Sequence, residues 1–211
     1  METIEEGGME QEGFTLWFTG LTAAGKTTVA RLVAQELRER GRKVELLDGD
    51  EIRRNLGDEL GFTKEDRDRN VLRIGYVCKL LSRNGIVAIG AAVSPYKETR
   101  GRLRSEIGNF VEVYVRCPIA VCQQRDYKGI YESYRQGRLS RVSGMDDPYE
   151  EPDNPEVVLH TDSESPQESA QKVIRALEEL GYISPLGSHG IGYTDEERLL
   201  VEKRLSELGY I

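Results

Sequence analysis

The stretch GLTAAGKTT at residues 20–28 constrains the fold of this chain more than any other part of its sequence. It matches the phosphate-binding loop pattern, in which a glycine, four residues of any type and a second glycine precede a lysine and a serine or threonine. Backbone N–H groups of such a loop point at the β-phosphate of a nucleotide, the lysine contacts the β and γ oxygens, and the hydroxyl binds Mg²⁺. The pattern therefore predicts a site for a nucleoside triphosphate and Mg²⁺.

The segments on either side of this loop support the prediction. A short apolar run, TLWFT at 15–19, precedes the loop, and TTVARLVAQELRER at 27–40 has apolar residues at helical spacing. Strand, loop and helix thus come in the required order, which a chance glycine turn does not explain. The predicted nucleotide contacts within the loop are Gly20, Leu21, Thr22, Ala23, Ala24, Gly25, Lys26, Thr27 and Thr28.

The rest of the chain alternates between strand and helix patterns. Further strands are predicted at 43–50, 86–93, 110–117 and 156–160, and further helices at 52–56, 63–85, 96–107, 118–124 and 166–181. The run IVAIGAAV at 86–93 is apolar throughout, as expected of a strand buried on both faces. We expect an α/β protein with a three-layer P-loop NTPase-type fold: a mainly parallel central sheet, helices on both faces, and a mobile lid at 126–155, where the pattern becomes irregular.

Length and composition bound the number of domains and the kinds of partner. We expect a flexible leader at 1–12, one P-loop domain at 13–183 and a helical extension at 184–211, whose last residues, RLSELGYI, echo ALEELGYI at 176–183. A net charge of −8 argues against a nucleic-acid partner. The acidic, glycine-rich N-terminus and the lack of a long apolar run argue against a membrane span and favour the cytoplasm. Cys78, Cys117 and Cys122 are expected to be buried, reduced thiols.

Polar residues that follow the second predicted strand complete a candidate site. Asp48 and Asp50 lie at the edge of the sheet where open α/β folds bind ligands, so either carboxylate is placed to bind Mg²⁺ or to accept a proton. The alternative is that DGD only makes a turn and caps the next helix. Further candidates for an anionic acceptor, or else for a solvated helix face, are Arg53, Arg67, Arg69, Arg73 and Asn70, with Arg125 and Lys128 near the lid.

These residues predict a small-molecule phosphotransferase, and several ordered motifs refine the prediction. The series GLTAAGKTT, LDGDEIRRNL, LGFTKEDRDRN, RIGYVCKLL, SPY, RDYKGIY and SGMDDPYEEP resembles adenylylsulfate kinase over residues 13–183. The resemblance implies transfer of the γ-phosphate of ATP, with Mg²⁺, to the 3′-hydroxyl of adenosine 5′-phosphosulfate in sulfate assimilation. It also raises a homodimer and an ATP sulfurylase as candidate partners.

The resemblance assigns roles to individual residues. It implies catalytic roles for Lys26 and Asp50, with Thr27 and Asp50 as metal ligands and Arg125 near the adenine of ATP. Ser94 matches a serine phosphorylated in this family, although direct in-line transfer needs no such intermediate and a serine that starts a turn is chemically simpler. The residues assigned to adenylylsulfate are Asp48, Arg53, Phe62, Arg67, Asn70, Lys128, Gly129 and Ile130.

The sequence departs from the family pattern at two places. Ala23 replaces a glycine of the loop, which is tolerable unless that residue needs a positive φ. Val142 stands where the family has a lid ring that stacks on the adenine of the acceptor, so affinity is reduced unless a neighbour such as Tyr127 or Tyr131 compensates. Two alternatives to the kinase therefore stay open: a regulatory kinase-like module of a sulfurylase system, and a kinase for another anionic acceptor.

Overall fold

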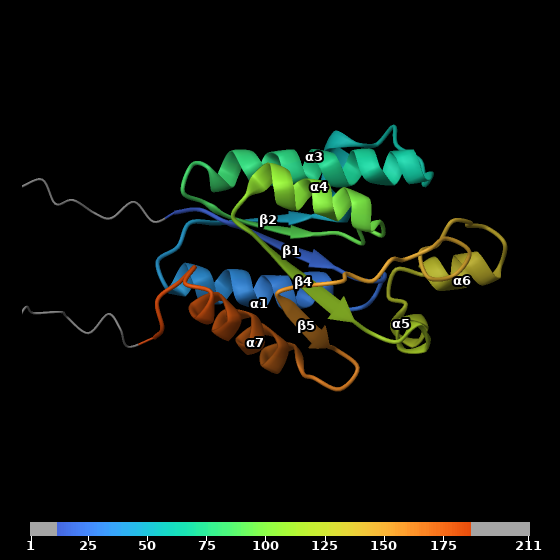
Figure 1. Cartoon of the computed structure of the whole chain (residues 1–211). Coiled ribbons are helices and arrows are strands. Elements are labelled where there is room, and N and C mark those ends of the chain that lie inside the picture. The colour runs from blue at the N-terminus through green and yellow to red at the C-terminus, as the bar shows by residue number, and fades with distance from the viewer. Residues whose placement is uncertain (1–11, 187–211) are drawn as a thin grey trace, which may run out of the picture.

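The computed structural model describes residues 12–186 and has three layers, with a parallel sheet between two layers of helices (Figure 1). The predicted helical extension beyond residue 186, and the predicted leader up to residue 11, lie outside the described residues. The sheet has the strand order β2-β3-β1-β4-β5. Its strands are β1 (Thr15–Thr19), β2 (Val44–Asp48), β3 (Val87–Ala91), β4 (Phe110–Arg116) and β5 (Val157–His160). The helices are α1 (Lys26–Glu39), α2 (Gly49–Leu56), α3 (Lys64–Ser82), α4 (Lys97–Ile107), α5 (Ile119–Arg125), α6 (Ile130–Arg135) and α7 (Pro166–Glu179).

The central strand β1 is buried along its whole length and supplies both cores. Because side chains alternate along a strand, Leu16 and Phe18 face one side and Trp17 faces the other. The first side is covered by α1 and α7, and the second by α3 and α4 (Figure 1). The predicted α/β fold, with helices on both faces of a parallel sheet, is confirmed.

Helix caps decide where several elements begin. The hydroxyl of Thr63 accepts a hydrogen bond from the backbone N–H of Asp66, as predicted, and Ser165 with Glu168 forms a capping box at the start of α7. Helix α1 differs, because its N-cap is Gly25, which has no side chain to cap it. The first N–H groups of α1 therefore lie where an anion can accept their hydrogen bonds.

Several predicted boundaries differ by a few residues, and the difference next to the site has an identifiable reason. The second strand ends at Asp48 instead of residue 50, because the Asp48 carboxylate caps α2, which begins at Gly49 instead of residue 52. The lid contains a short helix, α6, that was not predicted (Figure 1). Its only buried residue is Tyr131, so it has no apolar stripe that a periodicity argument could detect.

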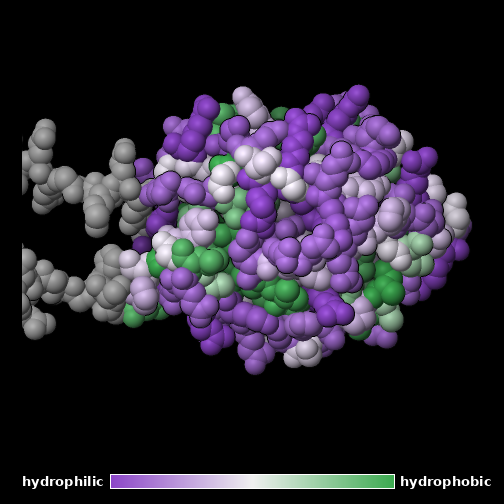
Figure 2. All heavy atoms as spheres, in the orientation of Figure 1, coloured by the Kyte–Doolittle hydropathy of each residue, from purple (hydrophilic) through white to green (hydrophobic). Residues whose placement is uncertain are grey.

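The described part of the chain has an almost wholly hydrophilic surface on the face in Figure 2, interrupted by small hydrophobic patches. Cys78, Cys117 and Cys122 are buried free thiols, as predicted. Within residues 12–186 no helix combines the length and the apolar character needed to cross a bilayer.

Candidate active site

A cleft opens at the C-terminal ends of the parallel strands. It joins the phosphate-binding loop to the ends of β2 and β3, to α2, to the start of α3 and to the lid. Most of the predicted site residues line it: Thr22, Ala23, Gly25, Lys26, Thr27, Asp48, Asp50, Arg53, Phe62, Arg67, Asn70, Ser94, Lys128 and Ile130. Residues that are scattered over more than one hundred positions of the sequence therefore share one site.

Lys26 lies folded over its own loop. Its Nζ donates hydrogen bonds to the carbonyl oxygens of Gly20 at 2.9 Å and Leu21 at 2.7 Å. Burial, together with repulsion from the charge of Lys128, lowers the pKa of Lys26 to about 8. The negative oxygens of a triphosphate would stabilise the charged form of this ammonium group.

The two candidate carboxylates have different surroundings. The hydroxyl of Thr27 donates to Asp48 Oδ2 at 2.7 Å, and Asp48 Oδ1 accepts the N–H groups of Asp50 and Glu51. Burial opposes ionisation of Asp48, but these hydrogen bonds prevail and hold its pKa below the usual value. Asp50 instead forms an ion pair with Lys128 of the lid. Asp48 thus contacts the nucleotide loop, and Asp50 contacts the lid.

The opposite wall carries an aromatic ring with two guanidinium groups near it. The Cζ atoms of Arg53 and Arg67 lie 4.6 Å and 5.6 Å from the centroid of the Phe62 ring, which is 44% exposed. Arg53 also donates to the carbonyl oxygens of Leu60 and Gly61. Such a wall can take a flat base on the ring and an anion beside it.

Asn70 completes this wall from α3. The residue is buried, and its Oδ1 is without a hydrogen-bond partner among residues 12–186. A buried polar atom in that state costs free energy until a donor reaches it. The residue lines the cleft, but its Oδ1 atom itself is buried and lies next to Gly57.

The lid is attached to the nucleotide loop at its first end. Tyr131 is fully buried and its hydroxyl donates to the carbonyl oxygen of Thr22 at 3.0 Å, so its ring cannot stack on a ligand. Asp126 accepts the N–H groups of Ile130 and Glu132, which fixes the start of α6. Tyr127, by contrast, is 68% exposed and lines the cleft.

The comparisons with known proteins agree with this arrangement. A family model described as adenylylsulphate kinase matches residues 12–160. The chain belongs to this family. An adenylyl-sulfate kinase of Picosynechococcus sp. is 51% identical over 177 residues, which cover 84% of this chain and 100% of that relative.

Two more members of the adenylylsulphate kinase family extend the comparison. A probable bifunctional SAT/APS kinase of Sorangium cellulosum is 51% identical over 176 residues, covering 83% of this chain and 30% of that longer relative. A solved structure of the APS kinase of Mycobacterium tuberculosis in complex with AMPPNP and APS has a TM-score of 0.76 and 39% identity. That match covers 79% of this chain and 98% of the other chain.

Ser94, the serine that matches the family phosphoserine, is only 2% exposed. Its Oγ accepts a hydrogen bond from Nε1 of Trp17 at 3.0 Å, and its backbone has a φ of +41°. The residue lines the cleft, yet its hydroxyl is engaged in the wall of the site. This geometry favours the simpler alternative, a serine that shapes the turn after β3.

Arg125 lies behind the loop instead of in the cleft. Its guanidinium donates to the carbonyl oxygen of Thr161 at 2.5 Å and contacts Sγ of Cys117 at 3.8 Å. Thr161 in turn donates through its hydroxyl to the carbonyl oxygen of Ala24 at 2.7 Å. The predicted role of Arg125 near the adenine of ATP stays a prediction. Thr161 is a neighbour of the loop that sequence reasoning missed.

The lid segment also supplies cleft residues that no sequence argument selected. Leu139, Ser140 and Ser143 line the cleft, and Oγ of Ser143 is buried without a hydrogen-bond partner in the described part of the chain. The sequence signal for an ordered loop next to these residues is the turn at 144–148, where Gly144 has a φ of +86° and the chain reverses.

Proposed function

We propose that this protein transfers the γ-phosphate of ATP to the 3′-hydroxyl of adenosine 5′-phosphosulfate, giving ADP and 3′-phosphoadenosine 5′-phosphosulfate. The observation that carries the proposal is one cleft that is lined both by Lys26 of the phosphate loop and by an aromatic ring with two arginines over it. Membership of the adenylylsulphate kinase family supports the same reaction, as does the M. tuberculosis relative, whose structure contains AMPPNP and APS.

The loop residues fit MgATP. Magnesium prefers oxygen ligands, and the Thr27 hydroxyl and the Asp48 carboxylate lie 2.7 Å apart beside the phosphate loop. These two residues would hold Mg²⁺, directly or through water, and the ion would neutralise charge on the β- and γ-phosphates. Lys26 would exchange its carbonyl partners for phosphate oxygens.

The opposite wall fits the acceptor. The exposed face of Phe62 takes the adenine, since base stacking on an aromatic side chain contributes about 1 to 3 kcal/mol. The guanidinium groups of Arg53 and Arg67 lie over the ring in the free protein, and on binding they can turn to the phosphosulfate group and hold it through forked hydrogen bonds. Asn70 lines the same part of the cleft, and a small shift of its amide would bring its unpartnered oxygen to the acceptor.

The transfer itself needs alignment and charge stabilisation. The 3′-oxygen attacks the γ-phosphorus, the bond to the bridging oxygen of ADP breaks, and the 3′-hydroxyl proton passes to a carboxylate, for which Asp50 is the candidate. Lys128, paired with Asp50 in the free protein, would supply positive charge to the transferred group. No serine intermediate enters this route.

The setting of the reaction is part of the proposal. We expect the protein to act in the cytoplasm, as a homodimer or with an ATP sulfurylase. The S. cellulosum relative, described as a bifunctional SAT/APS kinase, supports the second partner.

The experiment is an assay of purified protein with MgATP and adenylylsulfate, in which ADP and the 3′-phosphorylated product are both measured. Binding of adenylylsulfate without turnover would favour a regulatory module. Phosphorylation of another anionic acceptor, but not of adenylylsulfate, would mean that the lid has changed the specificity. Either result would contradict the proposed reaction.

A further inference from the structure

A buried arginine outside the cleft ties three separate segments together. Arg100 of α4 is 2% exposed, and its guanidinium donates to Glu112 Oε1 at 2.8 Å, to the carbonyl oxygen of Ser94 at 2.6 Å and to that of Glu150 at 2.7 Å. Glu112 belongs to β4, Ser94 to the turn after β3, and Glu150 to the last part of the lid, where the chain returns to the sheet. One side chain therefore joins the sheet, the wall of the cleft and the lid.

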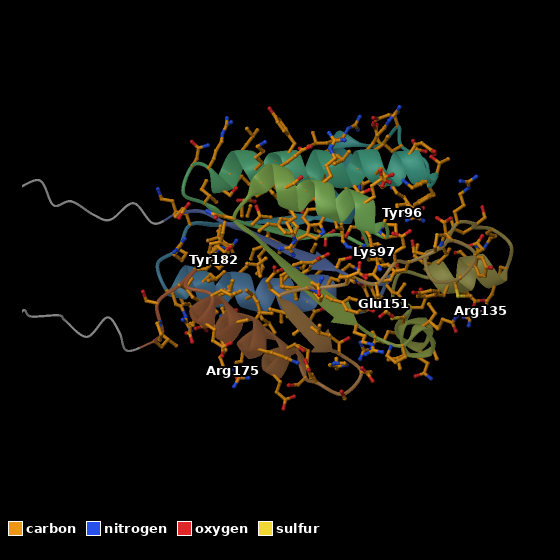
Figure 3. The ribbon with its side chains drawn as sticks, viewed as in Figure 1. Tyr96, Lys97, Arg135, Glu151, Arg175 and Tyr182 are labelled. Carbon is orange, nitrogen blue, oxygen red and sulfur yellow. The ribbon has the colours of Figure 1, made fainter. Side chains whose placement is uncertain are left out.

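The returning chain, which we call the strap and define as residues 149–153, has further anchors at the same edge. The hydroxyl groups of Tyr149 and Thr19 lie 3.0 Å apart, and Thr19 directly precedes the phosphate loop. The Glu150 N–H donates to the carbonyl oxygen of Pro95 at 2.8 Å, and its carboxylate accepts the N–H of Lys97 at 2.7 Å. In Figure 3 the strap, at Glu151, lies close to the sheet, whereas Arg135 of the lid lies much farther out.

The lid loop before the strap is held by its own hydrogen bonds. The Asp146 carboxylate accepts the N–H groups of Arg141 at 2.8 Å and Val142 at 2.7 Å. The N–H of Gly144 donates to the carbonyl oxygen of Asp147 at 2.8 Å. Only Pro148, whose φ is fixed by its ring, separates this loop, residues 141–147, from the strap. A displacement of the strap would therefore move the loop as a unit.

The same loop contacts the acceptor wall. Arg67 Nε lies 3.3 Å from Asp147 Oδ2, and its guanidinium also donates to the carbonyl oxygen of Arg141. Val142 and Ser143 line the cleft directly. The position of the loop thus sets both a wall of the cleft and the orientation of Arg67.

We infer that Arg100 is a positioning residue for the acceptor: by holding Glu150 and Ser94 together, it places the lid loop and Arg67 for adenylylsulfate. It touches neither substrate. The inference rests on the proposed function for the identity of the acceptor, but the path from Arg100 through the strap to the lid loop does not depend on that identity.

A double variant can separate the positioning role of Arg100 from its contribution to stability. Replacing both members of a buried pair by apolar residues is often neutral or stabilising, whereas removing one member leaves an unpaired charge. The double variant Arg100→Met/Glu112→Leu should therefore fold. Arg104, the other cation near Glu112, keeps its two-pronged pair with Glu156 at 2.6 and 2.7 Å. What the double variant loses is the link to Ser94 and Glu150.

The test compares the double variant with wild type and with a control, Arg102→Met, which removes an exposed arginine of the same helix. Arg100→Lys keeps the charge and serves as the conservative variant. We expect the KM for adenylylsulfate of the double variant to rise about tenfold or more, with the KM for ATP within about twofold of wild type. Arg100→Lys should recover part of this loss, and the control should match wild type.

Trypsin cleavage of the lid gives a second measurement that is independent of the acceptor. Arg135, Arg138 and Arg141 lie in the lid, and cleavage after them should be faster in the double variant than in the control. A folded double variant with unchanged lid cleavage, or with equal rises in the KM for both substrates, would overturn the inference. If wild type does not phosphorylate adenylylsulfate, the proposed function fails, while the lid cleavage still decides the role of Arg100.

Discussion

The hydroxyl of Thr27 donates a hydrogen bond to Asp48 at 2.7 Å, while Asp50, two residues farther along the chain, pairs with Lys128 of the lid. One turn of chain thus gives two neighbouring carboxylates different partners, one on the phosphate loop and one on the lid. Because Asp48 also caps α2, the segment that carries Asp50 has a fixed starting point. This division suggests separate roles, one toward the nucleotide and its Mg²⁺ and one toward the acceptor.

Substitution of each carboxylate by its amide should separate these roles. We expect Asp48→Asn to raise the Mg²⁺ concentration needed for half-maximal activity, because the amide binds the ion less well. Asp50→Asn should lower kcat by about 10²- to 10⁴-fold if Asp50 accepts the acceptor proton. Steady-state rates across a Mg²⁺ titration measure both effects. Full activity of the Asp50 variant at every Mg²⁺ concentration would remove that residue from the mechanism.

Lys26→Ala should abolish most turnover and leave the fold intact. A preorganised charge on the transferring phosphate contributes about 10²- to 10³-fold to kcat, whereas the lysine bonds only two loop carbonyls in the free protein. Initial rates, with circular dichroism as the measure of folding, give the comparison. Lys172→Ala, at a half-buried lysine of α7 that also forms polar contacts, is the matched control. A near-wild-type rate for Lys26→Ala would show that the loop assignment is wrong.

The lowered pKa of Lys26 predicts proton uptake when ATP binds. With a pKa of about 8, the lysine of the free protein is mostly neutral near pH 9, and the phosphates should restore its charge. Binding should then take up a fraction of a proton near pH 9 and almost none at about pH 6.5 from this group. Calorimetry of MgATP binding in buffers of different ionisation enthalpy measures it. Lys26→Met should lack the uptake; equal uptake in the variant would contradict the assignment.

The same pKa sets the contribution of Lys26 to the pH dependence of folding stability without a ligand. Since the pKa of the folded state lies below the ordinary value of 10.5, the unfolded chain binds more protons between these values. The free energy of unfolding therefore gains a contribution from Lys26 as the pH rises from about 8 to about 10.5. Below that window both states are protonated, and the cost of burying the charge is fully present.

The order of the elements was predictable because each strand and helix of the core has its own apolar period. The strand predicted at 15–19 agrees with β1, and α7 begins at Pro166 as predicted, since both have local signals in the chain itself. Helix α6 was not predictable in this way, because Tyr131 is held by a hydrogen bond to Thr22, more than one hundred residues away.

The site residues also divide into those with a local sequence signal and those placed by long-range contacts. Motifs with a fixed local geometry, such as the loop at 20–28, place their own side chains, so sequence reasoning selects them directly. Sequence reasoning said only that Ala23 is tolerable unless its φ is positive. The structure gives it a φ of +60°, which the sequence could not predict because the loop as a whole sets this angle. Arg100 and Tyr149 were missed because their partners lie in other elements, which no spacing rule brings together.

Ser94→Ala should retain measurable turnover. The transfer needs alignment and charge stabilisation, and the serine hydroxyl is buried against Nε1 of Trp17. Its removal leaves that donor unpaired, so the free energy of unfolding should fall by about 1 to 3 kcal/mol. Trp17 is the only tryptophan of the chain, so its fluorescence reports the change directly. A dead but folded variant, with a kinetically competent phosphoserine in wild type, would reverse our view of this residue.

Val142 is the departure that bears most on the identity of the acceptor. Val142 belongs to the lid, is 4% exposed, lines the cleft and packs into the hydrophobic core. A phenylalanine side chain at this position could lie either in the core or in the cleft. Kept in the core it would overpack, at a cost of about 1 to 3 kcal/mol in stability, whereas turned into the cleft it would offer a second stacking face opposite Phe62. The melting temperature and the acceptor affinity therefore distinguish the two placements.

We expect Val142→Phe to place its ring in the cleft and to tighten adenylylsulfate binding, by up to about 1 to 3 kcal/mol. The effect should appear in the KM for adenylylsulfate and leave that for ATP nearly unchanged, because the ring acts only on the acceptor. Calorimetry of adenylylsulfate on the ADP-loaded protein measures it, and Val142→Leu, which adds volume without a flat face, is the control. An equal gain in both variants would argue against stacking. No gain, together with weakened binding in Tyr127→Ala, would mean that the exposed ring of Tyr127 already covers the adenine.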